Sequence, residues 1–452
     1  MGTLFGTDGV RGVANEYPVT TEMALAIGRA AAIVLGSNTS AANASPIIIG
    51  RDTRLSGSML ECALAAGICS TGADVILTGV IPTPAVAHLA REMRCAAGIV
   101  ISASHNPFED NGIKIFTADG CKLTPEQEER IEQLTLSPAP PVSLPASERI
   151  GRVTSADGNA IKSYIEFCKS SFPSNQTLNG IKVALDCANG AASQVAPAIF
   201  AALGADVTTI HAAPDGININ KDCGSQHTSD LAAKVIETGA NIGLAFDGDA
   251  DRLIAIDETG RELTGDHIIA ICAQNLRAQR RLRNDLVILT PMSNLGLRLA
   301  FDKLGIRWLD AGVGDRLVVE LMKKEGATLG GEQSGHVIFL DKHSTGDGII
   351  TALQLLSAML AANAKLSELA SIFEPAPQTL INITVREKPA IETLPEVARA
   401  IADAELALAG RGRVLVRYSG TQPMCRVMVE AESSDTCESI AAHIADLLKK
   451  HI

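Results

Sequence analysis

The chain has 452 residues, of which 46% are hydrophobic and 20% are charged. It is longer than one hydrophobic core usually supports and too apolar for a disordered protein, so we expect several compact domains. The formal net charge of -12 excludes an overall positive field that would attract nucleic acid or an anionic membrane surface. A phosphate ligand would therefore need a local cationic pocket.

The amino terminus, MGTLFGTDGVRG, predicts neither secretion nor a lipid anchor. Asp8 and Arg11 come before any apolar stretch of signal-peptide length, and Gly6 stands where a myristoylation signal needs Ser or Thr. No apolar run approaches about 18 residues, so we expect no transmembrane helix. The ten cysteines form no Cys-x-x-Cys pair, which favours reduced thiols. These features predict a cytoplasmic protein without a membrane or nucleic-acid partner.

Four segments repeat one pattern, in which a helical stretch ends at a glycine and an apolar run follows. They are residues 71–80, 202–212, 237–249 and 324–335. A glycine just past a helix supplies its left-handed cap, and the apolar run suits a strand buried on both faces of a parallel sheet. The alternation predicts α/β architecture.

A second pattern is an apolar run that passes into small polar residues, at 98–107, 182–193 and 286–296. We interpret the two patterns together as three related α/β units. Ligands in such sheets bind outside the carboxyl ends of the strands, so the loops there are the first candidates for chemistry.

Three polar or proline-rich stretches, at 137–147, 257–265 and 374–378, suggest domain boundaries. The last segment alternates apolar and polar residues and ends in a helical stretch, which predicts a smaller α+β domain able to close over a cleft. The predicted domains are residues 1–150, 151–256, 257–373 and 374–452.

In GIVISASHNP, Ser102 and Ser104 lie at the end of an expected buried strand, and the turn signal Asn106-Pro107 follows. One interpretation is an exposed nucleophile, and the other is a serine that caps a strand-to-helix turn. His105 adds little as a base, because the side chains of adjacent residues generally diverge.

Asp247, Asp249 and Asp251 alternate on a loop between two apolar runs, in LAFDGDADRLIAID. Hard oxygen ligands at this spacing suit Mg²⁺, and clustered carboxylates without a cation would be costly. A calcium-binding EF-hand loop is a competing interpretation, but Arg252 stands where that loop needs glycine, and the flanks look like strands. A solvated acidic turn is a third interpretation.

Two further loops carry candidate binding residues. ATLGGEQSGHVIF places Glu332, Ser334 and His336 between glycines that let the backbone approach a ligand, although such turns are common without one. VLVRYSGTQPMCRVMVEA places Arg417 and Arg426 around a glycine turn with two hydroxyl groups, which suits a phosphate. Two arginines beside a hairpin are also compatible with a plain solvated face.

Five motifs taken in order resemble the α-D-phosphohexomutase family along nearly the whole chain: FGTDGVRG, ISASHNP, DGDADR, GEQSGH and RYSGTQP. The resemblance implies three related α/β domains with mixed, largely parallel sheets and a smaller C-terminal α+β domain around a central cleft. Ser104 matches the family's phosphorylated serine. Asp247, Asp249 and Asp251 match its magnesium ligands, with the serine phosphate as a further ligand and one Mg²⁺ per chain.

The reaction implied by the resemblance is an intramolecular phosphoryl transfer. Phospho-Ser104 gives its phosphoryl group to a hexosamine phosphate, and the bound hexosamine 1,6-bisphosphate then turns around and returns the other phosphoryl group. Glucosamine 6-phosphate would thus become glucosamine 1-phosphate, a step towards UDP-N-acetylglucosamine and cell-wall precursors, with the bisphosphate as activator.

The resemblance also implies roles for the surrounding residues. Arg11, Lys114 and, more weakly, His336 would stabilise charge or move protons. The substrate would contact Glu332, Ser334, Arg417, Ser419, Gly420, Thr421 and Arg426. The expected partner is a small sugar phosphate, and the expected assembly is a monomer or a homodimer.

Four residues depart from the family pattern. Tyr418 stands where proline is usual and Gln422 where glutamate is usual, and Ala311 and Leu317 replace the commoner threonine and tyrosine. The same chemistry on mannose or glucose phosphates therefore stays open, as does a non-catalytic sugar-phosphate sensor.

Overall fold

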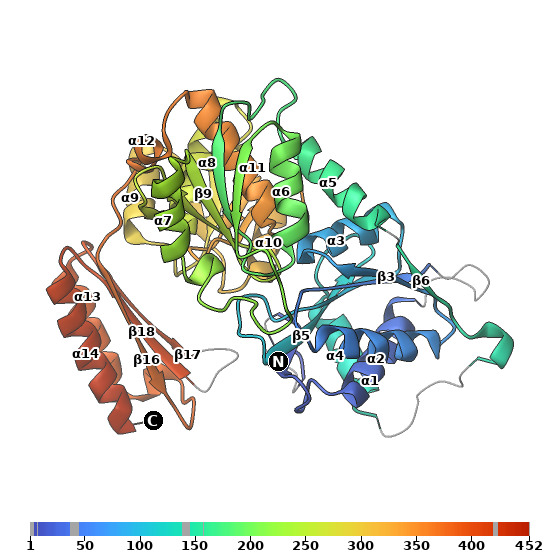
Figure 1. Ribbon diagram of the computed structural model, residues 1–452. Helices are drawn as coiled ribbons and strands as arrows, with labels where there is room; N and C mark the ends of the chain where they lie inside the picture. The colour runs from blue at the N-terminus through green and yellow to red at the C-terminus, as the bar shows by residue number, and fades with distance from the viewer. Residues whose placement is uncertain are drawn as a thin grey trace.

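A computed structural model describes residues 4–6, 8–36, 45–137, 145–156, 158–418 and 424–451. Its described strands form four sheets that follow one another along the chain. Figure 1 shows the first three units, coloured from blue to orange, packed side by side, and the C-terminal unit in red standing at one end.

The first sheet has six strands. In spatial order they are β1 (Val10–Val13), β5 (Asp110–Thr117), β4 (Ala97–Ile101), β2 (Ile47–Arg51), β3 (Val75–Val80) and β6 (Val153–Ser155). The strands β4, β2, β3 and β6 run parallel, whereas β5 is antiparallel to both of its neighbours.

The second and third sheets repeat this arrangement. The second has the order β11 (Glu262–Leu263), β10 (Leu253–Asp257), β9 (Ile242–Phe246), β7 (Lys182–Asp186) and β8 (Asp206–Ile210). The third has the order β13 (Arg307–Asp310), β12 (Leu286–Leu289), β14 (Leu329–Gly331) and β15 (Val337–Phe339). In each sheet a central strand has parallel neighbours on both sides, and one of these pairs with an antiparallel strand.

The helices lie between these strands and on the faces of the sheets (Figure 1). They are α1 (Thr21–Leu35), α2 (Gly57–Cys69), α3 (Thr83–Glu92), α4 (Pro125–Thr135), α5 (Asn159–Ser171), α6 (Ala192–Ala202), α7 (Ser229–Thr238), α8 (Gly265–Ala278), α9 (Leu295–Leu304), α10 (Asp315–Glu325), α11 (Gly348–Ala362), α12 (Leu366–Ala370), α13 (Pro395–Leu408) and α14 (Ser434–His451). None of the helices in the described residues is both long and apolar enough to span a membrane.

The strand β2 shows why helices cover both faces of the first sheet. Successive side chains of a strand point to opposite faces, so a fully apolar strand needs cover on both. Ile47 and Ile49 belong to the core beneath α1 and α2, whereas Ile48 belongs to a second core with α3. The continuous apolar run in the sequence thus becomes a strand in the middle of three layers.

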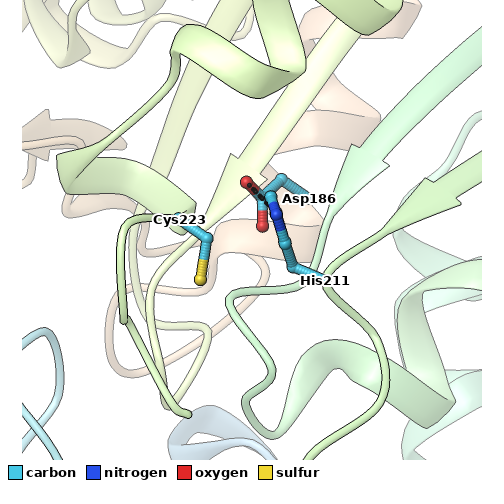
Figure 2. Close-up of side chains that lie close together, drawn as sticks. All are labelled: Asp186, His211 and Cys223. Carbon is cyan, nitrogen blue, oxygen red and sulfur yellow. Dashed lines mark hydrogen bonds and ion pairs between the residues drawn. The ribbon is translucent and has the colours of Figure 1, made fainter.

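Polar side chains gather where the parallel strands end. Asp186 is the last residue of β7, and His211 and Cys223 lie beside it in the segment that follows β8 (Figure 2). This placement agrees with the rule that polar sites form outside the carboxyl ends of strands in α/β sheets.

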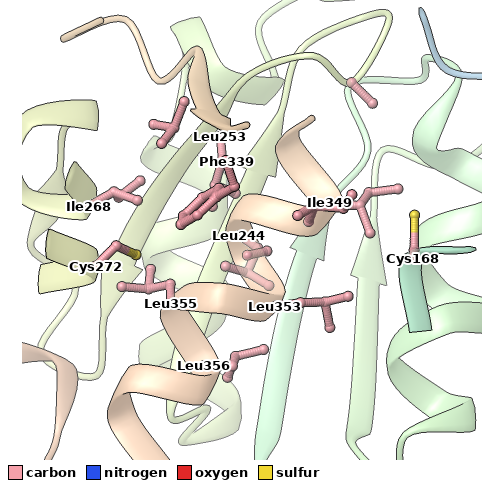
Figure 3. Close-up of a cluster of buried hydrophobic side chains, with 14 of the residues drawn as sticks. Cys168, Leu244, Leu253, Ile268, Cys272, Phe339, Ile349, Leu353, Leu355 and Leu356 are labelled. Atoms are coloured by element: carbon pink, nitrogen blue, oxygen red, sulfur yellow. The ribbon is translucent and has the colours of Figure 1, made fainter. Parts of the chain in front are cut away.

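One continuous apolar core joins the first three units. Helix α11 lies in its middle, with residues Gly348 through Met359 all buried. Figure 3 shows Leu353, Leu355 and Leu356 of this helix among apolar side chains from β9, β10 and α8. Because the core is shared, these three units pack as one body.

The C-terminal unit has its own sheet and its own core. Strand β18 (Met424–Glu430) lies between β16 (Gln378–Thr384) and β17 (Arg413–Tyr418), and all pairings are antiparallel. Figure 1 shows α13 and α14 on one side of this sheet. The fold class is therefore confirmed: three α/β units with mixed sheets, followed by a smaller α+β unit.

The predicted domain ranges stay a proposal. The first sheet extends to Ser155 through β6, and the second extends to Leu263 through β11. A domain defined by its sheet thus ends a few residues beyond the breaks at 150 and 256 that composition suggested.

Candidate active site

Ser104 lies in a turn after β4 that several segments hold in place. Its backbone is left-handed, with φ of +54°, and its amide donates to the Ser102 hydroxyl at 2.9 Å. Its carbonyl accepts from Arg54 Nη2 at 3.0 Å and from Asn220 Nδ2 at 2.9 Å. Only 1% of Ser104 is exposed. Residues of both the first and the second unit therefore hold this turn in place.

The Ser104 hydroxyl donates to Asp247 Oδ2 at 2.6 Å. It also lies 3.3 Å from His105 Nδ1, so the prediction that these adjacent side chains diverge is wrong. The left-handed backbone at Ser104 is the reason, because alternation of side chains holds only for extended chain. Burial, together with the positive charges of Arg252 and Arg11, lowers the pKa of His105 to about 3.

Asp247, Asp249 and Asp251 converge in the loop between β9 and β10. One carboxylate oxygen from each lies within 4.8 Å of the others, and all three residues are buried. Burial, and then the charges of Asp251 and Asp249, raise the pKa of Asp247 well above its usual value. Asp249 Oδ1 is buried without a hydrogen-bond partner among the described residues. Hard oxygen donors with an unsatisfied atom fit a divalent cation such as Mg²⁺.

Lys114 points from β5 to the same carboxylates. Its ammonium lies 2.8 Å from Asp249 Oδ2, 3.2 Å from Asp8 Oδ2 and 3.4 Å from Asp251 Oδ2. Burial by itself lowers the pKa of this ammonium, but the three carboxylates outweigh burial and raise it above its usual value. Arg11 forms an ion pair with Asp8. Lys114 thus contacts the acidic loop directly, whereas Arg11 contacts Asp8, which Lys114 also contacts.

His336, from the third unit, completes the group of charged side chains around the acidic loop. Its Nδ1 lies 3.5 Å from Asp251 Oδ1 and its Nε2 lies 3.5 Å from Asp315 Oδ2. Burial by itself lowers the pKa of His336, but Asp251 and Asp315 raise it to about 9. These two carboxylates thus favour the protonated form of the imidazole.

Several residues that organise this site were not predicted from the sequence. Lys122 forms ion pairs with Asp8 and with Asp315, which joins the first unit to the third. Arg54 is 1% exposed, and it bonds both Asp52 and the backbone of the Ser104 turn. A signal for Arg54 was present, because the apolar run at 47–49 passes through Gly50 into the charged stretch RDTR at 51–54.

A cleft of about 830 Å³ opens beside these groups, and all four units line it. Among the predicted site residues, those that line the cleft are Arg11, Glu332, Ser334, Arg417 and Arg426. The cleft lies next to Arg252 and His105, whereas Ser104 and the three aspartates are buried behind it.

Glu332 and Ser334 lie in the loop between β14 and β15. Glu332 accepts from the Gly314 amide at 3.3 Å and from the Ser334 hydroxyl at 3.3 Å. Both of these bonds are long, and Glu332 and Ser334 both line the cleft.

Arg417 and Arg426 lie directly opposite each other on β17 and β18. Burial, and then the charge of Arg426, lower the pKa of Arg417. Both cationic side chains line the cleft from adjacent strands, an arrangement that suits an anionic ligand. The predicted contacts Ser419, Gly420 and Thr421, together with Gln422, lie outside the described residues.

Models of one protein family match four successive parts of the chain. The matches are to the phosphoglucomutase/phosphomannomutase α/β/α domain I at residues 2–139, domain II at 162–260, domain III at 264–376 and the C-terminal domain at 380–447. The chain belongs to the phosphoglucomutase/phosphomannomutase family.

Relatives within this family match from end to end. The chain is 55% identical over 452 residues to the phosphoglucosamine mutase of Syntrophobacter fumaroxidans, and all of both chains is covered. It is 53% identical over 455 residues to the phosphoglucosamine mutase of Syntrophus aciditrophicus, again over the full length of both.

Solved structures share the fold of this family member. A phosphoglucomutase/phosphomannomutase family protein from Burkholderia thailandensis superimposes with a TM-score of 0.80 at 26% identity, over 99% of this chain and 97% of that one. The N-acetylphosphoglucosamine mutase of Aspergillus fumigatus, solved with GlcNAc-6P and magnesium, has a TM-score of 0.69 at 16% identity, over 99% and 95% of the two chains.

Proposed function

We propose that this phosphohexomutase interconverts glucosamine 6-phosphate and glucosamine 1-phosphate, with Ser104 as the phosphoryl carrier. The observation that carries the chemistry is the contact of 2.6 Å between the Ser104 hydroxyl and Asp247, within a group of three buried aspartates. The choice of sugar is supported by relatives named phosphoglucosamine mutase that are 53% and 55% identical over the whole chain.

Asp247, Asp249 and Asp251 are the proposed ligands of one Mg²⁺, with phospho-Ser104 as a further ligand. The donor set and the unsatisfied Asp249 Oδ1 support this assignment. A related fungal enzyme was solved with magnesium. When bound, the ion would neutralise the negative charge of a transferring phosphoryl group.

The protein's own cations would stabilise the same charge. Lys114 lies within 3.4 Å of two of the aspartates and projects from the strand that follows the Ser104 turn. Arg11 lines the cleft beside it. These two residues are the proposed electrostatic groups of the transfer, and His336, which contacts Asp251 at 3.5 Å, is a candidate to hold or move a proton.

The far side of the cleft would hold the phosphate that is not reacting. Arg417 and Arg426 face each other across β17 and β18, and both line the cleft. Ser419, Gly420 and Thr421 are proposed as additional donors to that phosphate. Since the reacting and the resting phosphate then occupy separate places, a bound 1,6-bisphosphate must turn around between the two transfers.

Glu332 and Ser334 would hold the sugar in either orientation. They lie in the cleft between the acidic loop and the arginine pair. Of the departures from the family pattern, Ala311 and Leu317 are not among the described residues that line the cleft.

A substrate panel tests the proposal. The chain, with Mg²⁺ and a trace of glucose 1,6-bisphosphate, is given glucosamine, glucose and mannose phosphates in separate assays. We expect kcat/KM to be highest for glucosamine phosphate. Faster turnover of mannose 1-phosphate or glucose 1-phosphate would assign the chain to the alternative activity of a phosphomannomutase/phosphoglucomutase.

Ser104→Ala tests the carrier, with Ser58→Ala on the exposed surface of α2 as the matched control. Intact mass should reveal a phosphoryl group on the unmodified chain and on the control, and none on Ser104→Ala, which should have no activity. Retained mutase activity in Ser104→Ala would refute the carrier role. A folded, unphosphorylated chain that turns over no sugar phosphate would instead be the non-catalytic sensor.

A further inference from the structure

A second group of metal-ligating side chains lies at the carboxyl end of the second sheet. Asp186 ends β7, His211 follows β8, and Cys223 precedes the short helix η2 (Gly224–Gln226). One donor atom from each lies within 4.8 Å of the others. Figure 2 shows the carboxylate and the imidazole in contact, with the thiol beside them.

The donor set differs in kind from the acidic loop. A thiolate, an imidazole and a carboxylate are the ligands that Zn²⁺ takes, whereas Mg²⁺ prefers oxygen alone. Three protein ligands are also the number found in zinc sites that leave one position open. The chemistry therefore favours a borderline-soft divalent cation.

An outer carboxylate supports the same assignment. His211 Nδ1 lies 3.0 Å from Asp186 Oδ2, and its Nε2 lies 3.5 Å from Asp230 Oδ2. With Nδ1 on a metal, Nε2–H would donate to Asp230. Metal-bound histidines usually donate their second ring N–H to a carboxylate or a carbonyl in this way.

Asp186 is oriented before any cation binds. Its Oδ1 accepts from the Ala188 amide at 2.8 Å, and its Oδ2 accepts from the Gly224 amide at 2.9 Å. Oδ1 can accept a further interaction from a cation, whereas Oδ2 also contacts His211 Nδ1, so a cation bound between them would replace that contact. Asp186 and Cys223 are buried, whereas the His211 side chain is 26% exposed, which leaves a route from solvent.

We propose that Asp186, His211 and Cys223 form a second cation site, which takes Zn²⁺ and is separate from the Asp247, Asp249 and Asp251 group. The competing explanation is that Asp186 and His211 merely join two loops by their hydrogen bond.

Occupancy of this site would act on the Ser104 turn. The segment between His211 and Cys223 carries Asn220, which donates to the carbonyls of Ser104 at 2.9 Å and Asn106 at 3.0 Å. A cation that ties both ends of this segment to β7 would restrain Asn220, and with it the turn that presents the serine.

Cobalt titration of the full chain tests the proposal, because a Co²⁺–thiolate bond has a charge-transfer absorption in the near ultraviolet. The titration is done with the unmodified chain, Cys223→Ser, Asp230→Asn and Asp247→Asn, and with Cys62→Ser as an exposed cysteine control. Zn²⁺ affinity is measured in parallel by competition with a chromophoric chelator in excess Mg²⁺.

We expect the absorption to saturate at one Co²⁺ in the unmodified chain, Cys62→Ser and Asp247→Asn, and to vanish in Cys223→Ser. Asp230→Asn should lower Zn²⁺ affinity roughly 10-fold to 100-fold, as loss of an outer carboxylate does. A folded unmodified chain without this absorption, or an unchanged absorption in Cys223→Ser, would overturn the site. Should Cys223→Ser not fold, His211→Gln takes its place.

Discussion

The environment of Ser104 is assembled from residues far apart in the chain. Arg54 and Asn220 bond its carbonyl, and Asp247 accepts from its hydroxyl, across separations of 50, 116 and 143 residues. The sequence alone allowed two interpretations of Ser104, a serine that caps a turn and a nucleophile. Its burial against a carboxylate favours chemistry, because a capping serine bonds a backbone amide and needs no acidic partner.

At the scale of single residues, Mg²⁺ should stabilise the chain through the acidic loop. A ligand at about 100 times its dissociation constant adds about 2.7 kcal/mol to the free energy of unfolding. EDTA should therefore lower Tm, and added Mg²⁺ should restore it. In Asp249→Asn the rise with Mg²⁺ should be absent, since a ligand oxygen is lost.

The control for this experiment is Asp206→Asn, at the exposed start of β8. It should keep the full rise in Tm with Mg²⁺. An equal rise in Asp249→Asn would place the stabilising ion elsewhere.

At the scale of elements, the loops that carry Ser104, the three aspartates and Glu332 occupy equivalent positions in their three sheets. Each joins a parallel strand to its antiparallel neighbour: β4 to β5, β9 to β10, and β14 to β15. The helix, glycine and strand pattern of the sequence is confirmed in all four places. The second sequence pattern was less uniform, because residues 98–107 begin within β4, whereas 182–193 and 286–296 begin with β7 and β12, the counterparts of β2.

Helix α11 gives the prediction at this scale. Leu353 is fully buried in the core that the first three units share (Figure 3). Leu353→Ala should lower the free energy of unfolding by about 2 to 5 kcal/mol, because a cavity forms where the side chain was. Urea unfolding followed by circular dichroism measures the loss.

Leu406→Ala on α13 is the matched control, since Leu406 is 78% exposed. It should change the free energy of unfolding by no more than about 0.5 kcal/mol. An equally small change in Leu353→Ala would mean that the shared core does not hold these units together.

At the scale of the whole molecule, the C-terminal unit is attached at the cleft itself. Arg413 on β17 donates to the carbonyls of Pro291 at 2.8 Å and Ser293 at 2.6 Å, and it pairs with buried Glu430. These carbonyls flank Met292, which lines the cleft. The orientation of Arg417 and Arg426 is thereby coupled to the loop after β12.

Arg413→Lys should weaken sugar phosphate binding. Lysine has no planar fork with which to bridge two carbonyls and a carboxylate. We expect kcat/KM to fall on the order of tenfold, mostly through KM, because a bond that orients a binding unit is lost. Steady-state kinetics measure the change. Arg411→Lys, at an arginine that is 65% exposed, should leave both constants unaltered.

Asp266 adds a pH dependence at the same junction. Its Oδ2 accepts from the Asn294 amide at 2.7 Å, and burial together with Glu430 raises its pKa to about 7. Between about pH 4 and the folded pKa, the folded chain holds a proton that the unfolded chain has lost. The free energy of unfolding therefore falls as pH rises through this window, by roughly 4 kcal/mol at most.

Asp266→Asn removes this ionisation. The Tm of the variant minus that of the unmodified chain should therefore grow between about pH 4 and about pH 7 and level off above. Differential scanning fluorimetry over this range measures it. A constant difference across the range would show that Asp266 ionises normally in the folded chain.

The amino-acid sequence by itself determined the α/β class, the smaller last unit and the loops that carry the chemistry, because glycine caps, apolar runs and acidic or basic turns are local properties. Only the tertiary structure decided which side chains meet. The roles of Arg54, Lys122 and Asn220, the contact between Ser104 and His105, and the group of Asp186, His211 and Cys223 all depend on how strand ends and a left-handed turn are placed in space. Such contacts between distant segments leave no periodic trace in the chain.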